Sequence, residues 1–172
     1  RARKMKYEVV DNFLDQQDFN NLEEVLFHEE FPLFLQKNIT FKDKSNEKGV
    51  FFTHVFQHWG KNEHNTTEYI FHHLQPVLNK LKPQLLRLQF NLHPRTFIKR
   101  YNPYHQDNAM SHKGCLLYMN TNNGNTILKT GIFGKKIKSI ANRALLMDPS
   151  DIHRSTTCTD ADYRGVLVIN YL

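Results

Sequence analysis

The sequence has only two cysteines, Cys115 and Cys158, too few for a disulfide framework. We expect both thiols to be reduced, as in a cytoplasmic compartment. No apolar run approaches the roughly 18 residues that a transmembrane helix needs, and no apolar stretch follows the basic N-terminus as it would in a signal peptide. These absences argue against a disulfide-stapled secreted domain and against a membrane partner, so we expect a cytoplasmic location.

Several catalytic motifs are also missing. The chain contains no Gly-x-Ser-x-Gly elbow, no phosphate-binding loop and no Gly-x-Gly-x-x-Gly fingerprint. Neither cysteine has a histidine arrangement typical of a nucleophile, and we find no internal repeat, linker or low-complexity segment. Serine hydrolase, nucleotide triphosphatase and dinucleotide-binding functions therefore have no support in the sequence.

The composition is that of a single folded domain. Of the 172 residues, 40% are hydrophobic and 13 are phenylalanine, enough for a substantial core. The net charge of +6 permits an acidic partner such as nucleic acid. The basic residues are scattered along the chain, however, which favours a solvated surface over a dedicated nucleic-acid groove.

The first half of the chain predicts two helices. A helix capped by Asp15 should run to about Phe27, and a second, capped by Thr66 or Thr67, should run to about Lys80, with Pro76 bending it. Each has apolar residues at helical spacing. Short strands are expected over 7–10 and 50–56, separated from the helices by polar loops.

After Pro83 the pattern changes to short apolar or alternating segments separated by turn residues, which predicts a β-sandwich or barrel. Asn122-Asn123-Gly124 suits the positive φ angles of a hairpin turn. We predict a mainly β fold with flanking helices: a double-stranded β-helix, or jelly roll, with the helices packed on one sheet. It should be one domain over 1–172, with N-terminal helical support over about 7–82 and a core over about 85–172. The expected core strands are 85–92, 95–101, 113–120, 126–130, 136–140, 143–147 and 163–171.

The most informative residues are His105 and Asp107, followed by His153. Side chains at i and i+2 of an extended segment point the same way, so His105 and Asp107 could bind one metal together. His153, which follows a tight turn, could supply a third ligand from a strand folded back beside them. Two histidines and one carboxylate are the ligand set of non-heme Fe(II) oxygenases. The alternative is a loop histidine, a turn aspartate and a structural histidine.

Arg164 strengthens this interpretation because it opens the apolar run 165–169. A guanidinium fixed at the head of a buried strand can bind a carboxylate through two hydrogen bonds. Arg164 could instead pair with Asp160 or Asp162. The ligands and the anchor together suggest a dicarboxylate cosubstrate.

These residues lie in stretches that resemble the 2-oxoglutarate- and Fe(II)-dependent oxygenase superfamily, in its prolyl 4-hydroxylase-like branch and with some likeness to phage-type members. The likeness is good over the C-terminal two-fifths and looser over 7–22, where the chain is similar to the family's strand-then-helix start. The matching stretches are RYNPYHQD (100–107), CLLYMNTNNGNT (115–126), ANRALLMDP (141–149) and IHRSTTCTDADYRGVLVINY (152–171).

The resemblance implies a jelly-roll hydroxylase in which His105, Asp107 and His153 hold Fe(II) and Arg164 anchors 2-oxoglutarate. It also implies that Tyr101 and Tyr118 contact the cosubstrate. O2 is the second cosubstrate, and ascorbate an accessory reductant. Asn120 and Thr126 are further candidates for the same pocket. Because Asp107 is retained, the resemblance favours hydroxylation over halogenation.

The resemblance implies prolyl residues of a protein or peptide as the substrate. Two rivals remain. One is an oxidative nucleic-acid demethylase of the same superfamily, which the basic charge permits, although the second arginine typical of those enzymes is replaced here by Asn170. The other is a jelly-roll module that binds metal and partners without turnover. The stretch Gly124-Asn125-Thr126 also departs from the Gly-Gly-x-Thr of many prolyl hydroxylase-like members.

Overall fold

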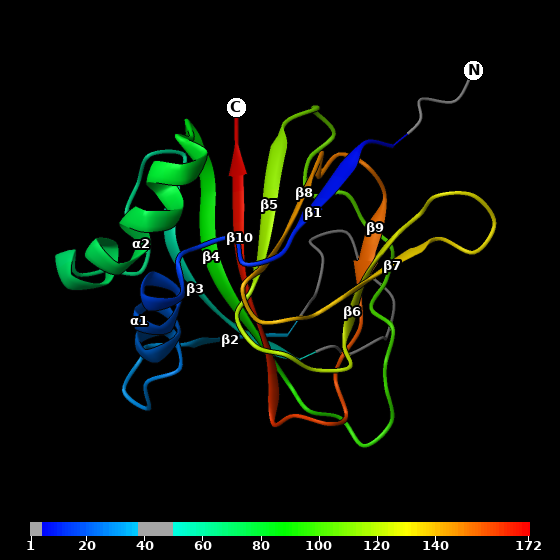
Figure 1. Ribbon diagram of the computed structural model, residues 1–172, viewed down its shortest axis with the longest axis horizontal. Helices are drawn as coiled ribbons and strands as arrows, with labels where there is room; N and C mark the ends of the chain where they lie inside the picture. The colour runs from blue at the N-terminus through cyan, green and yellow to red at the C-terminus, as the bar shows by residue number, and fades with distance from the viewer. Residues whose placement is uncertain (1–4, 38–49) are drawn as a thin grey trace.

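The computed structural model describes residues 5–37 and 50–172. Two antiparallel sheets form the centre of the molecule, and both helices lie on one side of the larger sheet (Figure 1). The seven-stranded sheet has the order β1-β8-β5-β10-β4-β3-β2, and the three-stranded sheet has the order β7-β6-β9. The elements are β1 (Tyr7–Val10), α1 (Gln16–Leu26), β2 (Phe34–Gln36), β3 (Phe51–His58), α2 (Glu68–Leu81), β4 (Leu85–Pro94), β5 (Lys113–Tyr118), β6 (Asn125–Leu128), β7 (Lys135–Lys138), β8 (Arg143–Met147), β9 (His153–Ser155) and β10 (Tyr163–Tyr171).

The two faces of the larger sheet have different partners. On one face, apolar residues of both helices pack against alternate strand residues such as Leu167 and Ile169 of β10. On the other face, Val166 and Val168 of β10 pack against Leu128 and Ile137 of the smaller sheet. Because side chains alternate along a strand, Arg164 and Asn170 share the face of Val166 and Val168. The predicted jelly roll with helices on one sheet is confirmed.

Both helices form close to the predicted positions. The helix α2 begins after Thr67, whose hydroxyl accepts a hydrogen bond from the backbone N–H of Ile70, and it continues through Pro76. Asp15 precedes α1 without making a side-chain cap. Among the described residues, no helix has the length and apolar character needed to cross a membrane.

Two strand predictions are wrong. Residues 95–101 form no strand: Tyr101 makes only an isolated bridge to Thr156, and Thr96 bonds instead to the backbone of Cys158 and Ile98. Asn122-Asn123-Gly124 is not a hairpin turn, because β5 and β6, which flank it, belong to different sheets. Asn122 Oδ1 accepts a hydrogen bond from the Gly124 N–H. Position 124 requires glycine because a Cβ added there would lie only 2.6 Å from Cδ of Arg164.

The hairpin in this region is one connection later. The strands β6 and β7 pair directly, from Leu128↔Lys135 to Asn125↔Lys138. Gly131 and Gly134 in the connecting turn have φ angles of 57° and 70°, which glycine adopts without strain. The short strands β2 and β9 were not among the expected core strands, because three residues give too little alternation to detect. The polar loop expected over 42–49 lies outside the described residues.

Candidate metal centre

Backbone pairing brings the two candidate histidines together. The N–H of His105 donates to the carbonyl of His153 at 2.9 Å, and the N–H of His153 donates to the carbonyl of His105 at 3.0 Å. Residues that exchange both hydrogen bonds lie directly opposite each other, with their side chains on the same face. The ring centroids are accordingly 4.5 Å apart.

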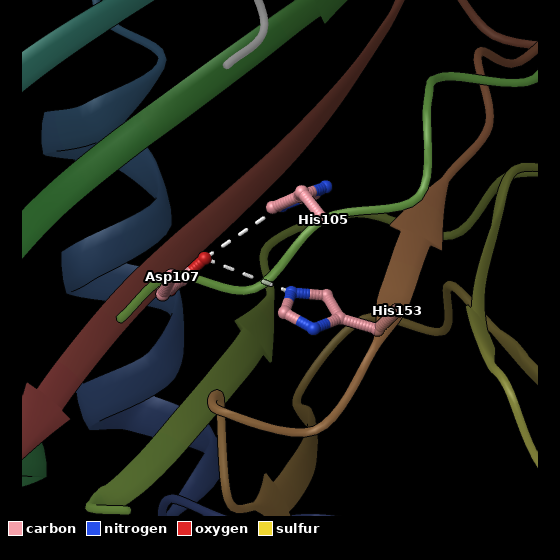
Figure 2. A group of neighbouring side chains, drawn as sticks. All are labelled: His105, Asp107 and His153. Carbon is pink, nitrogen blue, oxygen red and sulfur yellow. Dashed lines mark ion pairs between the residues drawn. The ribbon is translucent and has the colours of Figure 1, made fainter. Parts of the chain in front are cut away.

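Asp107 completes the group from the same segment as His105. Its Oδ1 lies 3.6 Å from Nε2 of His105 and 3.7 Å from Nε2 of His153. Figure 2 shows dashed lines from the carboxylate to both imidazoles, and candidate ligand atoms of all three residues lie within 4.8 Å of one another. Two atoms bound to one metal at about 2.1 Å can be at most about 4.2 Å apart. Both distances to Asp107 meet that requirement.

The hydrogen bonds of the imidazoles fix which nitrogen faces the site. Nδ1 of His153 is 2.8 Å from the carbonyl of Asp151, and Nδ1 of His105 is 3.2 Å from the carbonyl of Pro103. A carbonyl oxygen only accepts, so each Nδ1 must carry the proton, and each Nε2 presents a lone pair. Burial, followed by the neighbouring His153, lowers the pKa of His105, which keeps its ring neutral and able to bind a metal.

Two residues that the sequence analysis did not single out hold Asp107. Its Oδ2 accepts from Nη2 of Arg87 at 2.7 Å and from Nδ2 of Asn170 at 2.9 Å. Arg87 of β4 and Asn170 of β10 are cross-strand partners, which places both beside the carboxylate. Burial alone would raise the pKa of Asp107, but Arg87, His153, Asn170 and His105 outweigh it and hold the pKa below its usual value. Oδ1 therefore remains a charged, available ligand atom.

The donor set fits a divalent iron. Two imidazoles and one ionised carboxylate converge from one face, the arrangement that leaves positions for further ligands in non-heme iron sites. Each of the three side chains has a partner that orients it: Pro103 for His105, Asp151 for His153, and Arg87 with Asn170 for Asp107. Outer-sphere partners of this kind are the usual support of a metal site.

We expect Arg87→Met to lower the Fe(II) affinity by about 10- to 100-fold, as loss of an outer-sphere partner commonly does. The change removes the guanidinium that orients and charges Asp107 while keeping most of the apolar stem. Anaerobic calorimetry with Fe(II) measures the affinity. Arg95→Met is the matched control, since within the described part of the chain Arg95 pairs only with the exposed Asp162. Equal Fe(II) affinities of wild type and Arg87→Met would show that Arg87 does not support the site.

Arg164 crosses the interior between the two sheets. Its side chain is 2% exposed, its Nε donates to the Ser139 hydroxyl at 2.8 Å, and its Nη2 donates to the Thr126 hydroxyl at 3.1 Å. Within residues 5–37 and 50–172, no carboxylate forms an ion pair with it, so neither Asp160 nor Asp162 is its partner. A buried guanidinium held only by hydroxyls is a candidate binding site for an anion, because its charge has no carboxylate partner among the described residues.

The position of Arg164 relates it to the metal ligands. Thr126 and Leu128 lie on the same face of β6, and Leu128 is the cross-strand partner of His153. The guanidinium therefore lies about two residues along β6 from the histidine, or roughly 7 Å. A dicarboxylate could bind the metal at one end and Arg164 at the other.

The two candidate tyrosines are in different places. Tyr118 is fully buried, its hydroxyl donates to Thr126 at 2.8 Å, and the Arg164 guanidinium lies 5.5 Å from its ring centre. Burial raises the pKa of Tyr118, which keeps the phenol protonated. Tyr101 is 49% exposed, and its ring lies 4.7 Å from the guanidinium of Arg154. The structure shows no contact between Tyr101 and Arg164, so the role of Tyr101 as a cosubstrate contact stays a prediction.

The two remaining pocket candidates, Thr126 and Asn120, also lie in different places. Thr126 bonds to both Arg164 and Tyr118, so it lies at the candidate anion site. The side chain of Asn120 instead accepts from the N–H of Gly165 and donates to the carbonyl of Tyr163. Asn120 therefore fixes the start of β10, where Arg164 lies.

His93 is the cross-strand partner of Arg164 and makes stability depend on pH. Burial, followed by the charge of Arg164, lowers the pKa of His93 to about 3. The folded protein keeps this ring neutral, whereas the unfolded chain protonates it below about pH 6.5. The free energy of unfolding should therefore fall by about 1.4 kcal/mol for each pH unit from about 6.5 down to about 3 on account of this residue.

Urea unfolding between neutral and acidic pH tests this expectation against His93→Phe, which keeps a ring stacked on Phe51. The variant should lose stability less steeply, with a slope smaller by about one proton. Other histidines contribute equally to both proteins, so the difference isolates His93. Identical slopes would mean that His93 titrates normally in the folded state.

No protein-family model and no curated protein matches this sequence. Solved structures do match. An oxidoreductase of the 2OG-Fe(II) oxygenase family from Burkholderia pseudomallei superposes with a TM-score of 0.70 at 10% identity, over 96% of this chain and 84% of that one. A Pseudomonas putida prolyl-4-hydroxylase matches with a TM-score of 0.60 at 12% identity, over 97% and 92%. A Trichoplax adhaerens prolyl hydroxylase, in complex with a hypoxia inducible factor peptide fragment, matches with a TM-score of 0.64 at 14% identity, over 96% and 83%.

Proposed function

We propose that this protein is an Fe(II)- and 2-oxoglutarate-dependent dioxygenase. The observation that carries the proposal is the convergence of His105, Asp107 and His153 on one point, with their free ligand atoms turned toward one another (Figure 2). Arg164, which is buried between the two sheets and has no carboxylate partner among the described residues, supports a dicarboxylate cosubstrate. The chain shares its fold with 2OG-Fe(II) oxygenases, which supports the same assignment.

When bound, iron and 2-oxoglutarate supply the oxidation: one O2 oxidises 2-oxoglutarate to succinate and CO2 and inserts one oxygen atom into a substrate C–H bond. The residues of the chain bind and orient. His105, Asp107 and His153 would hold the metal, and Arg87 with Asn170 would keep Oδ1 of Asp107 facing it. Ascorbate would serve as an accessory reductant.

The anion site would hold the far carboxylate of 2-oxoglutarate. Arg164 would donate to it through its guanidinium, and the hydroxyls of Tyr118 and Thr126 border the same position. The Val166 and Val168 side chains on the same face of β10 would keep water from this end of the site. We propose Tyr118, and on the resemblance alone Tyr101, as cosubstrate contacts.

For the substrate we propose prolyl residues of a protein or peptide. Two of the structural neighbours are prolyl hydroxylases, and one of them is bound to a peptide fragment. Residues 108–111, which follow the metal ligand Asp107, are exposed and available to a polypeptide. The nucleic-acid demethylase remains less favoured, because Asn170 serves here as a donor to Asp107 where those enzymes have an arginine.

The proposal is tested by succinate formation from 2-oxoglutarate in the presence of Fe(II), O2 and a library of proline-containing peptides. We expect succinate in amounts matched by peptides that gain one oxygen atom. Succinate without any oxidised peptide would support the oxygenase and contradict the prolyl substrate. No succinate from a folded, iron-loaded protein would contradict the enzyme and leave a binding module.

A further inference from the structure

Acidic residues are unevenly distributed along this chain. Between Glu68 and Asp148 the only acidic residue is Asp107, the candidate metal ligand, and it is held by Arg87. The same stretch has twelve lysines and arginines. Arg87, Arg95 and Arg143 pair with Asp107, Asp162 and Asp11, so the excess positive charge of this stretch lies on its other lysines and arginines.

Strand register gathers part of this charge on one face. In the smaller sheet, Ile127 of β6 pairs with Lys136 of β7 on one side and with Arg154 of β9 on the other. Cross-strand partners point to the same face, so Lys136 and Arg154 project together. Lys138 is two residues from Lys136 along β7, so it projects to that face as well. Lys129 directly follows β6, and its Nζ reaches the ring of Tyr104 beside Arg154.

This face is turned away from the metal. The strands alternate, so the face opposite Arg154 carries His153 and its neighbours Thr126 and Leu128, which line the interior. By strand alternation, the charged side is the face of the smaller sheet opposite the buried cluster of Leu128 and Ile137. Figure 1 shows the strands of this sheet, β7, β6 and β9. It is a surface separate from the proposed catalytic site.

Two tyrosines continue the charged face beside β9. The guanidinium of Arg154 lies 4.7 Å from the ring centre of Tyr101 and 4.3 Å from that of Tyr104. Nζ of Lys129 lies 5.5 Å from the ring of Tyr104. Tyr101 is 49% exposed and Tyr104 is 39% exposed. Rings and cations therefore alternate across a partly open surface. We name this surface the outer cationic face and define it by Tyr101, Tyr104, Lys129, Lys136, Lys138 and Arg154.

Among the described residues, β6, β7, β9 and the segment 100–106 contain no aspartate or glutamate. Four cations on so small a surface repel one another, and an external polyanion would relieve that repulsion. The guanidinium of Arg154 and the rings of Tyr101 and Tyr104 also offer flat surfaces for stacking, which a polyanion without aromatic groups cannot use. Nucleic-acid bases stack on aromatic rings and guanidinium planes, whereas acidic side chains do not.

We propose that the outer cationic face binds single-stranded nucleic acid, with phosphates on its lysines and bases stacked against Tyr101, Tyr104 and Arg154. A single strand is favoured over a duplex because its bases are free to stack on the rings. Tyr101 is also proposed above as a cosubstrate contact, but the lysines, Arg154 and Tyr104 have no part in the oxygenase proposal, so nucleic-acid binding can be tested separately through them.

The test is fluorescence anisotropy with a labelled oligothymidylate of about 12 nucleotides, a length within the usual site size, without iron or 2-oxoglutarate. Neutralising about four phosphates predicts a slope of log affinity against log salt near −2.8, or about 50-fold weaker binding on raising salt from about 50 to about 200 mM. Lys136→Glu with Lys138→Glu should weaken binding by at least about tenfold. Lys61→Glu with Lys82→Glu makes the same charge change elsewhere and should leave most of the affinity.

A second arm separates nucleic acid from an acidic polypeptide. Tyr104→Leu should weaken oligothymidylate binding by about fivefold or more, because stacking contributes roughly 1–3 kcal/mol per base, and should leave the binding of polyglutamate of equal charge unchanged. Circular dichroism establishes that each variant is folded. The proposal is overturned if wild type does not bind the oligonucleotide, if both double variants weaken binding equally, or if polyglutamate binds as tightly and Tyr104→Leu has no effect.

Discussion

Replacing Asp107 with alanine should lower the Fe(II) affinity by more than about 100-fold, which exceeds the usual effect of losing an outer-sphere partner. The change removes the only anionic ligand, whose Oδ1 lies 3.6 Å and 3.7 Å from the two histidine Nε2 atoms. It also leaves the guanidinium of Arg87 beside the site without its counter-charge, which further disfavours a cation. Anaerobic calorimetry with Fe(II) measures the effect.

Loss of fold must be separated from loss of the ligand. Asp107→Ala combined with Arg87→Met removes the unpaired charge, and we expect it to fold and still not bind iron. Asp162→Ala, which removes an exposed carboxylate that pairs with Arg95 and lies outside the candidate metal site, should bind as wild type does. If Asp107→Ala binds Fe(II) with near wild-type affinity, the proposed ligand set is wrong.

The second large effect is expected at Arg164. Arg164→Met should weaken 2-oxoglutarate binding to the metal-loaded protein by at least about 100-fold, because a bidentate, charge-assisted pair contributes several kcal/mol. The ligand-free protein should be no less stable than wild type. Its buried guanidinium has no ion-pair partner among the described residues, so an apolar side chain of similar length removes a desolvation cost.

Thermal unfolding with and without 2-oxoglutarate measures both effects in one experiment. Wild type should gain stability with the ligand, and Arg164→Met should not. Arg143→Met is a control on another buried-stem arginine, since Arg143 pairs with the exposed Asp11 and should keep the ligand-induced shift. A large loss of stability in ligand-free Arg164→Met, with 2-oxoglutarate binding retained, would give Arg164 a purely structural role.

Two of the candidate metal ligands could be predicted from the sequence because their geometry is local. His105 and Asp107 share a face at i and i+2, and Arg164 opens an apolar run whose buried nature is plain. Arg87 and Asn170 could not be found this way, because their role depends on pairing between β4 and β10. One signal was present in the sequence. Asn170 lies six residues after Arg164, an even spacing that puts both side chains on the same face of a strand, here the interior of the sandwich.

The errors in the fold have similar causes. The Asn-Gly sequence at 123–124 predicted a hairpin because glycine commonly supplies a positive φ angle, but Gly124 is small to make room for Arg164. That requirement is set by a strand 40 residues away. The charge on the outer cationic face was scattered along the sequence for the same reason, and only the β6–β7 and β6–β9 registers bring it together.

The most direct test of the metal site is an anaerobic titration of the protein with Fe(II) and 2-oxoglutarate, followed by visible absorption, on wild type and His153→Ala. We predict a metal-to-ligand charge-transfer band that grows with 2-oxoglutarate in wild type and is absent in His153→Ala. A folded wild-type protein that shows no band, or a band of equal strength in His153→Ala, would contradict the proposed centre.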